Sequence, residues 1–138
     1  MTSRSREKLA PTDYQDLAEF RSLLRRFLAF SEVAARDAGL APQQHQALLA
    51  IKGFEGQPTI GNLAERLAIK HHSAVGLVDR LVGAGYLKRR TDKSDRRKVS
   101  LILTAAGEKL LQGLTFAHRQ ELRALTPSLR ALFAKLER

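Results

Sequence analysis

Apolar residues in this chain of 138 residues follow two different spacings, and the change between them limits the folds that it can adopt. Over residues 12–83, and again from residue 104, they recur every three or four positions, as on one face of a helix. Between Tyr86 and Leu103 they alternate with polar residues, on both sides of a polar turn at residues 91–95. The pattern predicts a mainly α fold with a small β-hairpin, an α+β class.

Signals at the ends of the helical stretches predict six helices. Thr12 and Gln15 have the spacing of a capping box, which places the start of the first helix at Thr12, and Gly39 should end this helix. Thr104 should cap a fifth helix, and Pro127 should lie in the first turn of a sixth. The predicted helices lie at residues 12–39, 42–52, 60–67 and 71–83, and from residues 104 and 127 onwards.

The composition indicates a single domain with a polyanionic partner. A length of 138 residues leaves no room for a second independent core, and 24 Lys and Arg against 14 Asp and Glu give a net charge of +10. The chain has no Cys, which excludes disulfides and thiol redox sensing. No apolar run is long enough for a membrane span or a secretory signal, so we expect a cytoplasmic protein with no membrane partner. Residues 1–11 should form a flexible basic tail.

The expected hairpin carries the densest positive charge in the chain. Its strands should span residues 86–90 and 96–103, with Val99 and Leu101 alternating with Ser100 in the second strand. The cations are Lys88, Arg89, Arg90, Lys93, Arg96, Arg97 and Lys98, against only Asp92 and Asp95. A two-stranded ribbon cannot bury so many cations, so they meet solvent or an anion such as DNA phosphate. The alternative is a charged turn that is merely solvated.

Two short helices joined by a brief break and followed by a basic hairpin form the pattern of a winged helix-turn-helix. We expect the second of these helices to bury Ala74, Val75, Val78, Leu81 and Val82. That leaves on its outer face His71, His72, Ser73, Gly76, Leu77 and Arg80 as candidates for DNA contact. Residues Lys70 to Ser73 also lie at the helix N-terminus, where free N–H groups favour a phosphate. Arg80 suits guanine, and Leu77 suits the methyl group of thymine.

Several of these residues have an alternative interpretation. Arg80 can form an ion pair within its helix turn beside Asp79, or with Glu65. His71 and His72 can be no more than a polar helix start.

The phenylalanines and the two remaining histidines also have more than one interpretation. Phe20, Phe27 and Phe30 are first expected in the core or at a dimer contact, and second as stacking partners of a ligand. His45 and His118 lie far apart in sequence and have no second metal ligand at helical spacing, so we expect no metal site. A buried or interface histidine, or one that lines a pocket, is the favoured interpretation of both.

The order of these motifs resembles the MarR family of transcriptional regulators. The resemblance covers nearly the whole chain and rests on residues 40–44, 59–67, 75–81, 85–87, 95–97 and 103–107. Its most specific part is Asp-Arg-Arg at residues 95–97 followed by Leu-Thr-Ala-Ala-Gly. Two positions depart from the family pattern: Ala41 stands where Ser or Thr often caps a helix, and the pair His71-His72 is unusual at the start of the reading helix.

The resemblance implies a homodimeric repressor of a palindromic site on double-stranded DNA. Residues 12–39 and 104–138 would be dimerisation helices, and residues 40–103 the DNA-binding lobe. An Arg of the wing enters the minor groove in this family, and Arg97 is the matching residue, oriented by Asp95, with Arg96 on phosphate. The apolar stripes of the terminal helices supply the expected dimer contacts: Leu17, Phe20, Leu24, Leu114, Leu122, Leu129, Leu132, Phe133 and Leu136.

Members of the family commonly release DNA when a small aromatic or phenolic acid binds, which implies a pocket here. Phe20, Phe27 and His45 are its expected residues. Nothing in the sequence predicts an enzyme or a cofactor, since it contains no glycine-rich phosphate loop, no Cys nucleophile and no familiar nucleophile–histidine motif. Two other functions remain open: a nonspecific or architectural DNA-binding protein, and a winged helix that binds an acidic partner protein.

Overall fold

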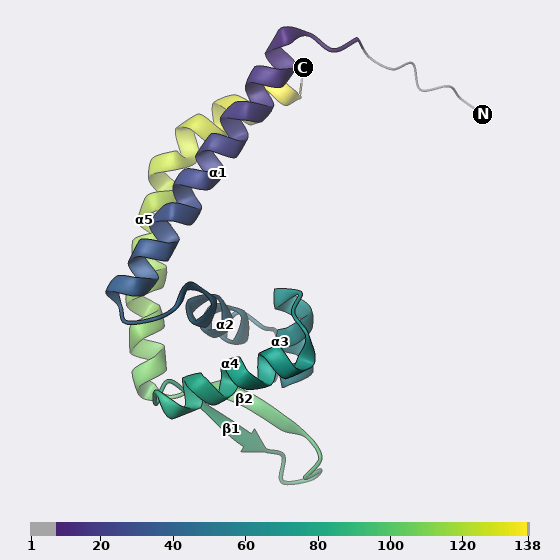
Figure 1. The fold of residues 1–138 in the computed structure, drawn as a ribbon, viewed down its shortest axis with the longest axis vertical. Coiled ribbons are helices and arrows are strands. Elements are labelled where there is room, and N and C mark those ends of the chain that lie inside the picture. Colours follow the sequence, from purple (N-terminus) through teal and green to yellow (C-terminus); the bar gives the residue numbers. More distant parts are fainter. Residues whose placement is uncertain (1–7, 138) are drawn as a thin grey trace, which may run out of the picture. The chain divides into compact units, whose positions relative to one another are not determined.

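The computed structural model describes residues 8–137, so residues 1–7 of the expected tail and Arg138 lie outside the described residues. The described chain forms helices α1 (Pro11–Asp37), α2 (Pro42–Lys52), α3 (Ile60–Leu67) and α4 (His71–Gly83), strands β1 (Leu87–Thr91) and β2 (Val99–Leu103), and helix α5 (Ala105–Leu136) (Figure 1). This agrees with the predicted mainly α fold with a single hairpin.

The described residues divide into two compact units, which we call the arm and the lobe. The arm contains residues 8–30 and 119–137, and the lobe contains residues 31–118. Helices α1 and α5 therefore contribute to both units, whereas α2, α3, α4 and the hairpin belong to the lobe alone.

Helix α1 begins one residue earlier than predicted, and its first turn is capped differently. The carboxylate of Asp13 accepts a hydrogen bond from the backbone N–H of Ala10 at 2.7 Å, so the expected capping box of Thr12 and Gln15 is wrong. The predicted end is confirmed, because Gly39 has a φ of +82° and the N–H of Leu40 bonds back to the carbonyl of Ala35 at 2.9 Å.

The lobe is built on a core of leucines from α2, α3, α4 and both strands. Leu48, Leu63, Leu81, Leu87 and Leu101 are each at most 2% exposed. Helix α4 packs against both α3 and β1, and Figure 1 shows it lying along the hairpin. Burial of this many large apolar side chains supplies the main force that holds the lobe together.

The hairpin is shorter than predicted in its second strand. Residues 96–98 belong to the connecting turn, because the N–H of Lys98 bonds to the carbonyl of Asp95 at 3.0 Å and the N–H of Asp92 to that of Lys98 at 2.9 Å. Ser100, expected on the polar face of the strand, is buried instead, and its hydroxyl donates to the carbonyl of Arg90 at 3.3 Å. This hydrogen bond offsets the cost of burying the hydroxyl.

The junction between β2 and α5 explains the Leu-Thr-x-x-Gly motif. The hydroxyl of Thr104 donates to the carbonyl of Gly85 at 2.6 Å and accepts from the N–H of Gly107 at 3.1 Å, so it caps α5 as predicted and ties it to the end of α4. A Cβ atom on Gly107 would lie 2.1 Å from the carbonyl oxygen of Tyr86. Only glycine allows this close approach of two backbones.

Helix α5 is one continuous helix, not the two helices predicted on either side of Pro127. Proline removes one backbone hydrogen bond from a helix interior. Leu125 and Leu132 are buried on either side of Pro127, at 3% and 1% exposure, and lie seven residues apart on one helix face. Their packing keeps the helix unbroken, and the Thr126 hydroxyl donates to the carbonyl of Leu122 at 2.8 Å.

Candidate nucleic-acid interface

Helices α3 and α4 form the helix-turn-helix that the sequence predicts. Thr59 caps α3 by accepting a hydrogen bond from the N–H of Asn62 at 3.2 Å. Ala68 then ends α3 in the left-handed conformation with φ +54°, and the N–H of Ile69 bonds back to the carbonyl of Ala64 at 3.0 Å. This tight turn sends α4 off in a new direction after only three residues.

The outer face of α4 differs from the predicted face at one position. His71, His72, Ser73 and Arg80 are exposed and Gly76 is half-buried, whereas Leu77 is 1% exposed. The expected contact of Leu77 with thymine is therefore wrong. Helix α4 buries Ala74, Leu77, Val78 and Leu81, spaced as one helical stripe, and leaves Val75 and Val82 only half-buried.

The first turn of α4 presents backbone N–H groups with no side-chain cap. Lys70 occupies the N-cap position in an extended conformation, and its side chain makes no capping hydrogen bond. Lys70, His71, His72 and Ser73 are all exposed. A helix start of this kind, beside a lysine, has the electrostatics that attract a phosphate group.

Asp79 on α4 forms an ion pair with Arg89 on β1, a residue absent from the predicted DNA-contact set. Within residues 8–137 no ion pair engages Arg80, so the alternative that pairs it beside Asp79 or with Glu65 is wrong. The opposite charges of an Asp and an Arg ten residues apart give no signal that could have predicted the pairing.

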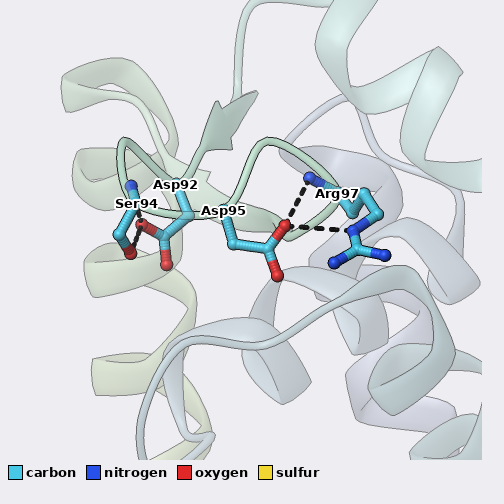
Figure 2. Close-up of polar contacts among 4 residues, drawn as sticks. All are labelled: Asp92, Ser94, Asp95 and Arg97. Atoms are coloured by element: carbon cyan, nitrogen blue, oxygen red, sulfur yellow. Dashed lines mark hydrogen bonds and ion pairs between the residues drawn. The ribbon is translucent and has the colours of Figure 1, made fainter.

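The turn of the wing is organised by two carboxylates (Figure 2). Asp92 accepts hydrogen bonds from the backbone N–H and the hydroxyl of Ser94, both at 2.8 Å. These hydrogen bonds, the backbone one foremost, hold the pKa of Asp92 below its ordinary value. Asp95 accepts from the backbone N–H of Arg97 at 3.1 Å and lies 3.4 Å from its Nε.

The cations at the tip of the wing project into solvent. The side chain of Arg97 is 94% exposed even though its Nε lies near the carboxylate of Asp95. Lys88, Lys93, Arg96 and Lys98 are exposed as well. The lobe thus presents a helix start, the outer face of α4 and a basic ribbon, which are the elements that bind the major groove, the minor groove and the phosphates of DNA.

His45 and His118 lie side by side in the lobe, despite their separation in sequence. They are 4% and 9% exposed, and their ring centroids are 4.7 Å apart. His118 Nδ1 contacts the carbonyl of Leu114 at 2.6 Å, and its Nε2 contacts the hydroxyl of Ser31 at 2.8 Å. Among the residues that the structure describes, His45 Nδ1 is buried and has no hydrogen-bond partner. Burial, and secondarily the electrostatic interaction with His118, lower the pKa of His45.

An open, mostly apolar depression of about 640 Å³ lies elsewhere in the lobe, between the end of α1 and the start of α5. Ala38, Tyr86, Leu110 and Leu114 line it, together with the charged residues Asp37 and Lys109. His45, one of the expected pocket residues, does not line this depression. Phe20 and Phe27 belong to the arm, and their expected role in a ligand pocket stays a prediction.

The arm leaves many of the predicted dimer residues exposed. Their exposed fractions are 62% for Leu17, 42% for Leu24, 44% for Leu122, 47% for Phe133 and 59% for Leu136. Phe20 and Leu129 are half-buried, and the Phe20 ring lies 6.2 Å from that of Phe133. Leu114 and Leu132 differ from the prediction, because they are 6% and 1% exposed and are already covered by their own chain.

Two kinds of feature are absent from residues 8–137. No helix in this range is long and apolar enough to cross a membrane. No three His or acidic side chains of the same range gather in a group that a metal ion would need.

Known proteins resemble this chain in both sequence and fold. Residues 38–98 match the MarR family. The uncharacterized HTH-type transcriptional regulator YcgE of Bacillus subtilis is 34% identical over 113 residues, which cover 82% of this chain and 71% of that protein.

Two solved structures share the fold at lower identity. A variant of S. aureus MepR bound to an oligodeoxyribonucleotide has a TM-score of 0.69 at 17% identity, covering 94% of this chain and 96% of that one. Staphylococcus aureus MarR in complex with salicylate and kanamycin also has a TM-score of 0.69, at 18% identity, covering 85% and 77%. YcgE is named as a transcriptional regulator. The helix-turn-helix, the basic wing and the sequence matches together place this chain in the MarR family of transcriptional regulators.

Proposed function

We propose that the protein is a homodimeric repressor that binds a palindromic DNA operator and releases it when a small aromatic or phenolic acid binds. The observation that carries the DNA-binding part is the exposed cationic surface of the lobe. The N-terminus of α4 and the wing lie in one unit, and Arg97 projects from the wing with a 94% exposed side chain. So much clustered positive charge is suited to the sugar–phosphate backbone of a duplex.

Within this surface the residues would have different roles. Lys70, His71, His72 and Ser73 would meet phosphate or base edges at the start of α4, and Arg80 would contact guanine. Arg97 would enter the minor groove while Asp95 orients it, and Lys88, Lys93, Arg96 and Lys98 would contact phosphate. The exposure of these side chains supports the assignment.

The homodimer is supported by the apolar surface of the arm. Residues 12–39 and 104–138 would supply the dimerisation helices, and residues 40–103 the DNA-binding part. Leu17, Leu136 and Phe133 are each exposed by nearly half or more, which is costly for large apolar groups unless a partner covers them. A two-fold dimer presents two reading helices to DNA, and this explains why a palindromic operator is expected.

The effector is supported by the depression beside α5, which is mostly apolar and has Lys109, beside Asp37, among its lining residues to bind an anionic group. Salicylate, present in the S. aureus MarR structure, is the natural first probe. Salicylate should release bound operator from the wild type and be less effective on a Lys109→Gln variant. Release that is equal in both proteins would exclude this depression as its site.

Selection of bound sequences from a random duplex pool, at near-physiological salt, tests the DNA-binding function. Recovery of an inverted repeat with half-sites about one helical turn apart would support a dimeric sequence reader. Tight binding without a shared sequence among the recovered duplexes would favour the nonspecific or architectural alternative, which the net charge of +10 also supports. The absence of any DNA binding at low salt would favour an acidic protein partner.

A further inference from the structure

Helix α4 and the first strand of the wing are joined by an ion pair that the roles above leave unused. Arg89 on β1 donates through its guanidinium to the carboxylate of Asp79 on α4. Asp79 is the single acidic residue of α4, and it precedes Arg80, the residue proposed to contact guanine. The pair therefore connects the reading helix to the wing beside the surface that would face DNA.

The pleat of β1 explains why Arg89, and not a neighbouring cation, reaches Asp79. Side chains two residues apart share one face of a strand, so Arg89 lies on the face of the buried Leu87. Its cross-strand partner is Leu101, which is also buried. Lys88 and Arg90 lie on the other face and are exposed.

Arg89 is also far less available to a ligand than the cations of the turn. Its side chain is 37% exposed, against 94% for Arg97. Asp79 is 59% exposed, and without Arg89 its carboxylate would repel nearby phosphate groups. An exposed ion pair changes a folding equilibrium by a factor of about five at most, so stability alone gives it little value.

We propose that Asp79 and Arg89 form a positioning pair that holds α4 in register with the wing and thereby sharpens the discrimination between DNA sequences. This inference rests on the DNA-binding function proposed above. Arg89 neutralises the carboxylate and fixes the helix against the strand, so that the outer face of α4 and the tip of the wing engage their grooves together. Neither residue contacts DNA in this arrangement.

The test compares Arg89→Met, Asp79→Asn, the double variant and Arg89→Lys with the control Arg90→Met. Arg90 is the matched control because it is the next residue of the same strand and is exposed on the opposite face. The dissociation constant of each protein is measured for the selected duplex and for a scrambled duplex, over a series of salt concentrations. Thermal unfolding of each variant checks that it is folded.

Under the proposal, Arg89→Met and Asp79→Asn each lower the ratio of specific to nonspecific affinity by about twofold to fivefold. The double variant loses no more than either single variant, because both remove the same interaction. Arg89→Lys keeps the charge but not the planar guanidinium, so it restores discrimination only in part. Arg89→Met alone also weakens binding to both duplexes, because it leaves the carboxylate of Asp79 unpaired, and the double variant removes this additional loss. Arg90→Met weakens binding to both duplexes without lowering discrimination, and it lowers the salt slope by about one.

The opposite pattern overturns the proposal. If Arg89→Met weakens binding to both duplexes equally, with a shallower salt dependence, and Asp79→Asn keeps full discrimination, then Arg89 is a phosphate contact. Full discrimination by the Arg89→Lys variant would also indicate that Arg89 is a phosphate contact. A wild type that shows no preference for the selected duplex would instead contradict the proposed sequence-specific function itself, so the two failures are distinguishable.

Discussion

The lobe and the arm use their apolar side chains in different ways. In the lobe, Leu48, Leu81 and Leu101 are at most 2% exposed, and the unit covers its own core. In the arm, Leu17 is 62% exposed and Phe133 is 47% exposed, so a large apolar surface is left uncovered. The contrast indicates that changes in the lobe should act on folding, whereas changes on the arm should act on association.

A core substitution in the lobe should have the largest effect on stability. Leu81→Ala removes a fully buried side chain and should lower the free energy of unfolding by about 2–5 kcal/mol. Leu17→Ala, on the exposed face of the arm, is the comparison variant. It should change the free energy of unfolding of the monomer by about 0.5 kcal/mol or less. Denaturant titrations measure both values, and equal losses would contradict the contrast between the units.

A charge on the arm should break the dimer and leave the chain folded. Phe133→Asp should weaken association by about 2 kcal/mol or more, because it places a carboxylate in the apolar contact. Leu49→Asp is a matched control, since Leu49 is 46% exposed but lies on α2 in the lobe. Sedimentation velocity gives the oligomeric state. If the Leu49 variant dissociates and the Phe133 variant does not, the dimer interface lies in the lobe and not in the arm.

The wing should matter for DNA and not for association. Arg97→Ala should cost about 1.5–3 kcal/mol of binding free energy, the range for a lost hydrogen bond to a charged group. Arg25→Ala, an exposed arginine of the arm, should have little effect in the same mobility-shift titration. Loss of the dimer in the Arg97 variant would mean that the wing has been assigned the wrong role.

Arg80 should act on one base pair, since no ion pair within residues 8–137 engages it. Arg80→Ala should relax discrimination at that position by about 1–3 kcal/mol per half-site. Binding to duplexes substituted at each position of the selected site would show this as a local change. A uniform loss over all sequences would make Arg80 a phosphate contact instead.

The smallest expected effect is a pH dependence of stability from His45. Because its pKa is lowered in the folded protein, the neutral form is favoured there, and its contribution to stability is complete above the ordinary value of 6.5. Stability should fall as the pH drops below that value, by at most about 1.4 kcal/mol per pH unit. Unfolding of the wild type and of His45→Gln from pH 7.5 to 5 measures it, with the exposed His71→Gln as control. An unchanged slope in the His45 variant would contradict this assignment.

Local sequence information was sufficient to predict several elements of the fold. The two spacings of apolar residues, with Pro42 and Thr59 as start signals and Gly39 as the end signal of α1, correctly predicted α2, α3, α4 and the presence of the hairpin. These signals act within a few residues of each other, through capping hydrogen bonds and backbone conformation. They can therefore be recognised in the sequence without knowledge of the rest of the fold.

Other features were decided by contacts between distant segments. Six apolar residues of α4 allow two buried stripes, and packing against α3 and β1 selected the one that contains Leu77. Packing of Leu125 and Leu132 likewise keeps α5 continuous through Pro127.

The sequence by itself therefore determined the fold class, the helix-turn-helix and the basic wing, because each depends on neighbours along the chain. Only the tertiary structure decided that Asp79 pairs with Arg89 and that His45 lies against His118. Such pairs form between groups whose distance depends on how whole elements pack, and side-chain identity alone does not encode that distance.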